Sequence, residues 1–204
     1  LFLSNFGSIN DLNSKKGVDL SDRLDKQGIF KKGSKEHDWV LNSDQGQRDV
    51  FSILPKLFNE FSKNFPDKKL VIRAHPAERI DPYIEMIKGL KNIYIVDDDK
   101  NTLSWIKASN LMISTNCTTS VEAFLLNRIS INLYKGIEIF YLPSKVSINT
   151  TTIDQTIKIL KDLYKTSFSK ETIKNNLDLN SLNDHLNKAL YNYSSEVCSV
   201  KEMI

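Results

Sequence analysis

Paired cysteines, long apolar runs and an excess of one charge are all missing from this chain of 204 residues. Its two cysteines, Cys117 and Cys198, lie far apart in the sequence, so we expect neither a disulfide framework nor a two-cysteine metal site. A reducing, cytoplasmic setting fits this cysteine usage best. No apolar run approaches the roughly 20 residues of a membrane-spanning helix, and we expect no signal peptide.

Charge and hydrophobicity narrow the class of protein further. The 28 basic and 25 acidic residues nearly balance, which gives a formal net charge of +3. The chain therefore lacks the electrostatic footprint of a nucleic-acid-binding protein. Hydrophobic residues make up 40% of the chain, which is enough for a buried core and argues against overall disorder. The length suits one sizeable α/β domain or a domain with appendages.

Short apolar segments alternate with segments of helical spacing along most of the chain. The apolar segments, which we expect to be buried strands, are Leu1–Phe6, Lys69–Arg73, Asn92–Val96, Asn110–Ser114 and Arg128–Leu133. Helical spacing is found over residues 43–65, Asp81–Leu90, Leu103–Ala108, Thr118–Asn127, Ile153–Tyr164 and Leu182–Tyr191. This alternation predicts an α/β fold with a doubly wound, Rossmann-like parallel sheet.

Two of the expected helices carry specific signals. The first has Ser43 or Asp44 as its candidate N-cap, and it contains Pro55, which we expect to kink the helix or restart it. In the second, the helical period predicts that four side chains face the core. They are Tyr83, Ile84, Ile87 and Leu90.

The domain organisation that we expect is a Rossmann-like domain over residues 1–150, followed by a C-terminal helical segment over residues 151–204. Residues 8–42 have no sustained period and few apolar anchors, so they predict a long loop or excursion with at most a short helix. Residues 134–150 are also expected to be irregular. Because the chain opens on an apolar run without Met, we expect a fragment or an excised domain.

A histidine follows one of the expected strands directly. In an open parallel sheet, ligands bind just beyond the carboxyl ends of the strands. His75 lies at such a position and precedes the rigid Pro76. Its imidazole can donate to a phosphate or ribose oxygen, and Arg73 or Arg79 can add positive charge. From spacing alone, a simple cap on the strand end explains His75 equally well.

A run of small hydroxyl residues follows another expected strand and opens a helix. The run contains Ser114, Thr115, Asn116, Thr118, Thr119 and Ser120. Hydroxyls and the free N–H groups of a first helical turn together suit a phosphate. Ordinary N-capping by Thr115 or Thr118 is the alternative, but one cap needs one hydroxyl, so the run favours an anion site.

The remaining polar residues are less specific. Glu122, one turn into the same helix, can reach a ribose diol, although periodicity favours a solvated helix residue. The triplet Asp97–Asp99 follows a strand and precedes a helix, so a solvated turn that caps this helix is the better interpretation. We expect no metal site, and the sequence has no Walker-type pattern of glycine and lysine.

These segments resemble elements of a known bacterial family. Residues 71–78, VIRAHPAE, resemble the "RPHP(S/A)E" element of bacterial surface carbohydrate biosynthesis proteins, and residues 114–123, STNCTTSVEA, resemble their "NSTTSLEA" element. The opening SNFGSIN is similar to their "NTNFGxxN" segment, and RISINL lies where they have "G-K-P-V-I". The chain departs from the pattern at Ala74, where proline is usual, and at residues 128–130, where Gly-Lys-Pro is usual.

That family is similar to GT-B glycosyltransferases, among them capsule Kdo transferases, bacterial sialyltransferases and CDP-glycerol glycerophosphotransferases. The resemblance implies that the chain is the nucleotide-binding half of such a fold and that the first domain binds a nucleotide-sugar. It further implies that the donor phosphates face His75, Thr118, Thr119 and Ser120, with Glu122 near the ribose. The other candidates for substrate binding are Arg73, Glu78, Ser114, Thr115 and Asn116. The general base of related enzymes comes from the other domain, so no catalytic residue is assigned.

We therefore expect a glycosyltransferase-like protein of capsule, lipopolysaccharide or other surface polysaccharide biosynthesis. Its donor would be a CMP- or CDP-linked sugar and its acceptor a glycan or lipid-linked molecule, with no metal and no further cofactor. A UDP-sugar epimerase-like enzyme and a non-catalytic nucleotide-sugar-binding subunit are the alternatives. An N-terminal domain or partner chain, and peripheral association with the inner membrane, stay open.

Overall fold

A computed structural model describes residues 1–12, 24–29, 31–97, 101–135 and 146–165. Cys198 and the helix expected over Leu182–Tyr191 lie outside these residues. Among the helices of the described part, none combines the length and apolar character that a membrane crossing requires.

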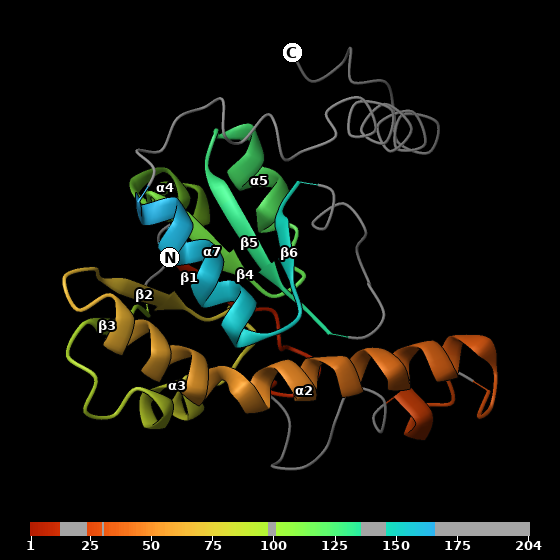
Figure 1. Cartoon of the computed structure of the whole chain (residues 1–204). Coiled ribbons are helices and arrows are strands. Elements are labelled where there is room, and N and C mark those ends of the chain that lie inside the picture. The colour runs from red at the N-terminus through yellow and green to blue at the C-terminus, as the bar shows by residue number, and fades with distance from the viewer. Residues whose placement is uncertain (13–23, 30, 98–100, 136–145, 166–204) are drawn as a thin grey trace.

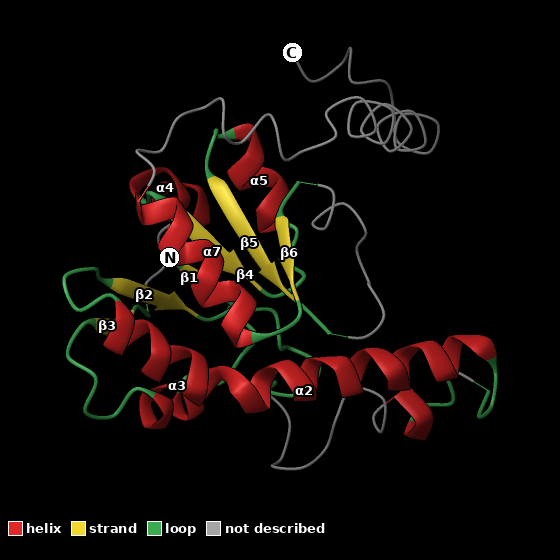
Figure 2. Cartoon of the chain, viewed as in Figure 1, coloured by secondary structure: helices red, strands yellow, loops and turns green. Residues whose placement is uncertain are grey.

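The described chain is built on one sheet of six parallel strands (Figures 1 and 2). In chain order the strands are β1 (Phe2–Leu3), β2 (Leu70–Arg73), β3 (Ile93–Ile95), β4 (Leu111–Ser114), β5 (Ile129–Leu133) and β6 (Ile148–Thr150). Their order across the sheet is β3-β2-β1-β4-β5-β6. The predicted α/β class and the parallel sheet are confirmed, and the five expected strands all form, although each is shorter than expected.

Helices cover both faces of the sheet. They are α2 (Lys35–Asn64), α3 (Asp81–Met86), α4 (Thr102–Ala108), α5 (Thr119–Leu125) and α7 (Ile153–Lys165). Helices α2, α3 and α7 share one apolar cluster with the side chains of Phe2, Ile72 and Ile113. Helices α4 and α5 share the other cluster with Leu3 and Met112. Successive strand residues therefore point to opposite faces, which explains why residues 70–72 of β2 and 111–113 of β4 are all apolar.

Helix α2 differs from the prediction at its start. Its N-cap is Ser34, whose Oγ accepts a hydrogen bond from the His37 backbone N–H at 3.2 Å. The predicted start at Ser43 or Asp44 is wrong, because both residues are buried inside the helix. The helix also continues through Pro55 without restarting. Its first turns carry mostly polar side chains, so the apolar period begins only well inside it, and part of the 8–42 segment expected as a loop is helical.

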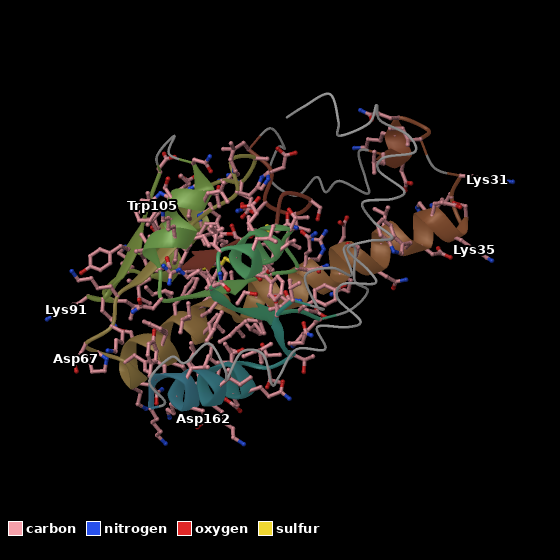
Figure 3. All side chains as sticks on the ribbon, turned by 90° about the horizontal axis from the view of Figure 1, so that it is seen from above. Lys31, Lys35, Asp67, Lys91, Trp105 and Asp162 are labelled. Atoms are coloured by element: carbon pink, nitrogen blue, oxygen red, sulfur yellow. The ribbon has the colours of Figure 1, made fainter. Side chains whose placement is uncertain are left out.

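Helix α2 has 30 residues, and its N-terminal turns extend beyond the sheet (Figure 1). In Figure 3, Lys35 at its first residue and Asp67 just past its last lie at opposite ends of the molecule. Phe58, in the second half of the helix, packs edge-on against Phe2 with ring centroids 5.4 Å apart. The aromatic and aliphatic residues of this half therefore anchor α2 on the central strand.

Two other expectations need correction. Helix α3 ends at Met86 and buries Tyr83, whereas Ile84 is 52% exposed, because a helix this short buries only a narrow stripe of its surface. Strand β6 forms inside the segment expected to be irregular. Apolar residues of helix α7 belong to the same cluster as those of the sheet.

Strand β6 is joined to the rest by side-chain hydrogen bonds as well as by its backbone. The hydroxyls of Ser130 and Ser147 lie 2.5 Å apart, and Asn132 donates from Nδ2 to Asn149 Oδ1 at 3.2 Å. The β5 residues Ser130 and Asn132 are buried. These two hydrogen-bonded pairs, called the β5–β6 pairs below, replace apolar contacts on one face of the sheet.

The two halves of α2 should respond differently to the same substitution. Leu57 is fully buried and Leu41 is 43% exposed. We expect Leu57→Ala to lower the unfolding free energy by about 2–5 kcal/mol, because it removes buried methyl groups and leaves a cavity. Leu41→Ala, the matched control on the same helix, should change it by less than about 0.5 kcal/mol. Urea unfolding followed by circular dichroism measures both, and equal losses would contradict the packing described.

Candidate functional site

A cavity of about 390 Å³ opens at the carboxyl ends of β1, β2 and β4. The chain leaves β1 toward β2 on one side, whereas β4 lies on the other side. The strand order therefore reverses at β1 and β4, and the loops that leave these strands diverge. Such a reversal is where ligands bind in doubly wound sheets. The cavity is lined by Leu3, Ser4, Asn5, Arg73, Ala74, His75, Pro76, Thr102, Cys117, Thr118 and Thr119.

His75 lines this cavity and is exposed. Its Nδ1 accepts a hydrogen bond from the Ala77 backbone N–H at 3.1 Å, so in the neutral ring the proton lies on Nε2. The backbone N–H of His75 donates to Ser4 Oγ at 3.2 Å. The imidazole therefore has a defined tautomer and a donor, Nε2–H, that it can offer to a ligand oxygen.

The structure distinguishes between the two arginines considered as charge donors. Arg73 ends β2, lines the cavity and donates from its guanidinium to Thr102 Oγ1 at 2.8 Å. Arg79 instead pairs with Asp81 at 3.2 Å and is absent from the cavity lining. The link from Arg73 to the first residue of α4 places one positive charge in the wall of the cavity.

The hydroxyl run after β4 divides into two groups. Thr118 and Thr119 line the cavity. Ser114 and Ser120 are fully buried and bond each other at 2.7 Å, while Thr115 Oγ1 accepts from the Asn5 backbone N–H at 3.0 Å. Thr118 is the N-cap residue of α5, yet its side chain makes no capping hydrogen bond. The run is therefore not explained by capping through Thr115 or Thr118, and only two of its residues line the cavity.

Asn116 sets the direction of this run. Its backbone has a φ of 50°, a left-handed conformation that asparagine tolerates better than most residues. Its N–H donates to Asn132 Oδ1 at 2.7 Å, and its carbonyl accepts from Asn5 Nδ2 at 3.2 Å. Contacts from β5 and from the end of β1 thus hold the turn that presents Thr118 and Thr119.

The two glutamates proposed from the sequence lie away from the cavity lining. Glu122 is half-buried in the first turn of α5. Glu78 is 2% exposed and accepts hydrogen bonds from Ser4 Oγ, from the Phe6 backbone N–H at 2.7 Å and from the Tyr83 hydroxyl. Burial raises the pKa of Glu78, and the hydrogen bonds that it accepts oppose this effect.

Of the ten residues proposed as substrate-binding, the cavity thus gathers Arg73, His75, Thr118 and Thr119. It adds Ser4, Asn5 and Thr102, which the sequence analysis did not select. Ser4 and Asn5 lie inside the strand expected over Leu1–Phe6, whereas β1 ends at Leu3, so an earlier strand end would have identified them. Burial raises the pKa of the Cys117 thiol beside them.

The charge and donor pattern of the cavity suits an anion. Its lining holds one guanidinium, one imidazole and several hydroxyl and amide groups, with no carboxylate among the described residues. Across the described part of the chain, no three His, Cys, Asp or Glu side chains gather in a way that could hold a metal ion.

The fold and site together define a Rossmann-like α/β protein with an anion-suited cavity at its switch point. A scan of the chain against protein-family models finds no match, and a search of curated proteins finds none either. The resemblance in the motifs therefore stays a prediction.

Asn132 should contribute stability through the turn that it holds. Asn132→Leu keeps the side-chain size but removes the acceptor of the Asn116 N–H. We expect it to lower the unfolding free energy by about 1–3 kcal/mol, since a buried donor loses its acceptor. Asn149→Leu, the control, removes the acceptor of the Asn132 side-chain amide at an exposed position and should cost less than about 1 kcal/mol. Urea unfolding of both variants tests this, and equal small effects would contradict the role of Asn132.

Glu78 should make stability depend on pH in a defined direction. Because its pKa is raised in the folded state, the folded chain binds this proton more tightly than the unfolded chain. Its contribution to the unfolding free energy therefore grows as pH falls from neutral through the folded-state pKa, and it is complete below the unfolded value. Glu78→Gln removes this component. Urea unfolding of both proteins should show that the unfolding free energy of the wild type rises relative to that of the variant as pH falls from about 7 to about 4. A constant difference between the two proteins over this range would refute the assignment.

Proposed function

We propose that this chain binds a nucleotide-activated sugar through its phosphates and acts as a glycosyltransferase-like protein of surface polysaccharide biosynthesis. The observation that carries the proposal is the cavity at the switch point, where Arg73, His75, Thr118 and Thr119 meet. A guanidinium, an imidazole N–H and hydroxyls are the donors that a diphosphate accepts. The CMP- or CDP-linked donor is taken from the motif resemblance.

In a transfer reaction these groups would act on the leaving phosphate. Negative charge grows on the phosphate oxygens as the bond to the sugar breaks, and donors already in place stabilise that charge without reorganising. Arg73 is held by Thr102 and His75 by Ala77 and Ser4. Their contacts within the protein support a prearranged site in which the ligand meets fixed donors.

A second candidate function is binding of a nucleotide-sugar without catalysis by this chain. The observation that favours it is the lack of a carboxylate among the described residues that line the cavity, because glycosyl transfer to a hydroxyl commonly uses a general base. Incubation with labelled CMP- and CDP-linked donors and lipid-linked acceptors, followed by mass spectrometry, separates the candidates. Multiple turnover supports the transferase, and an unchanged donor with measurable binding supports the binding protein.

Binding can be tested at single residues by calorimetry with CMP, CDP, UDP and inorganic phosphate. We expect His75→Ala to weaken CDP binding by about 1–3 kcal/mol, the usual cost of losing a charge-assisted hydrogen bond. Arg73→Gln should weaken it by a similar amount, for the same reason.

Arg79→Gln is the matched control, because Arg79 is also an arginine near β2 but pairs with Asp81 away from the cavity. It should leave the affinity unchanged. No binding of any of the four ligands to the wild type would sink the proposed function. Equal losses of affinity in Arg73→Gln and Arg79→Gln would show that the phosphate binds outside this cavity.

A further inference from the structure

We propose that Glu78 is a positioning residue for His75, which it holds at the cavity through Ser4 without contacting the ligand. This deepens the proposed function and rests on it for the ligand.

The link between Glu78 and His75 is a continuous chain of hydrogen bonds. The His75 backbone N–H donates to Ser4 Oγ at 3.2 Å, and the Ser4 hydroxyl donates to Glu78 Oε2 at 2.9 Å. The Glu78 backbone N–H closes the turn by donating to the His75 carbonyl at 2.8 Å. Glu78 therefore holds the His75 N–H through Ser4 and the His75 carbonyl through its own backbone N–H.

The carboxylate also ties together three separate elements. Besides Ser4, it accepts from the backbone of Phe6, beyond β1, and from the hydroxyl of Tyr83 on α3. Its two oxygens are thus occupied by donors from within the protein, and its side chain is buried. A carboxylate in this setting orients its neighbours and is shielded from a ligand in the cavity.

The rest of the loop has an independent anchor. The Leu12 N–H donates to the Ala77 carbonyl at 2.8 Å, and the Arg79 N–H donates to the Asn10 carbonyl at 2.9 Å. These bonds do not pass through the Glu78 side chain. Loss of the carboxylate should therefore loosen His75 and Ser4 while the far part of the loop stays in place.

The first test uses the ligand-free protein. In Glu78→Gln one of the two acceptor oxygens becomes an amide donor, which disturbs the bonds that Ser4 and Phe6 donate to this side chain. The His75 N–H should then exchange with deuterium faster than in wild type, while the N–H groups of Leu12 and Arg79 keep their rates. Ser4→Ala breaks the same chain from its other side and should have the same pattern. Unchanged exchange at His75 in both variants would overturn the proposal, whether or not any nucleotide binds.

The second test measures CDP affinity in a double-mutant cycle. We expect Glu78→Gln and His75→Ala each to weaken binding by about tenfold, and the double variant also by about tenfold rather than a hundredfold, because Glu78 acts through His75. Tyr83→Phe, the control, removes a neighbouring donor but leaves the path from Glu78 to His75 intact, so the affinity should be retained.

The outcomes of the cycle separate the two proposals. A roughly hundredfold loss of CDP affinity in the double variant would show that Glu78 supports stability in general and does not position His75. A tenfold loss of affinity in Tyr83→Phe would show the same. If the wild type fails to bind CDP while exchange at His75 still responds to Glu78→Gln, the proposed function fails and the positioning role stands.

Discussion

The hydrogen bonding of β1 on both of its edges is the constraint on which the rest of the structure depends. The strand has only two residues, yet it pairs with β2 through Phe2 and Ile72 and with β4 through Leu3 and Ser114. Phe2 points into one apolar cluster and Leu3 into the other. Because β1 lies where the strand order reverses, its pairing joins the two halves of the sheet and brings the loops of three strands to one place.

The pairing of β1 with β2 and β4 also determines the geometry of the cavity. Ser4 and Asn5, which continue from β1, contact the loop after β2 and the turn after β4. Each wall of the cavity is therefore held by residues that are distant in sequence, and the donors that it presents need little rearrangement to meet an anion. Such prearranged sites lower the entropic cost of binding.

The fold was predictable from local patterns. Which polar residues line the cavity, and which are buried behind it, was not. Strands buried on both faces produce largely apolar segments, so β2, β4 and β5 were recognisable, as was the placement of His75 after a strand. Strand β6, with only one apolar residue, and the polar first turns of α2 produce no such signal. Which hydroxyls meet the cavity is decided by Asn116, and its conformation depends on Asn132, 16 residues away. The burial of Glu78 could not be predicted from local sequence, because Ser4 and Phe6, which donate hydrogen bonds to its carboxylate, lie more than 70 residues earlier.

The β5–β6 pairs have a consequence for how this protein can diversify. A shift of β6 by one residue along β5 would turn Ser147 and Asn149 to the other side of the sheet and place Ile148 against buried polar groups. The two pairs therefore select one alignment for a strand too short to select it by its backbone alone. Replacement of Ser130 or Asn132 by itself leaves a polar group without its match, so substitutions within each pair should arise together during evolution, as linked changes at positions 130 and 147 and at positions 132 and 149.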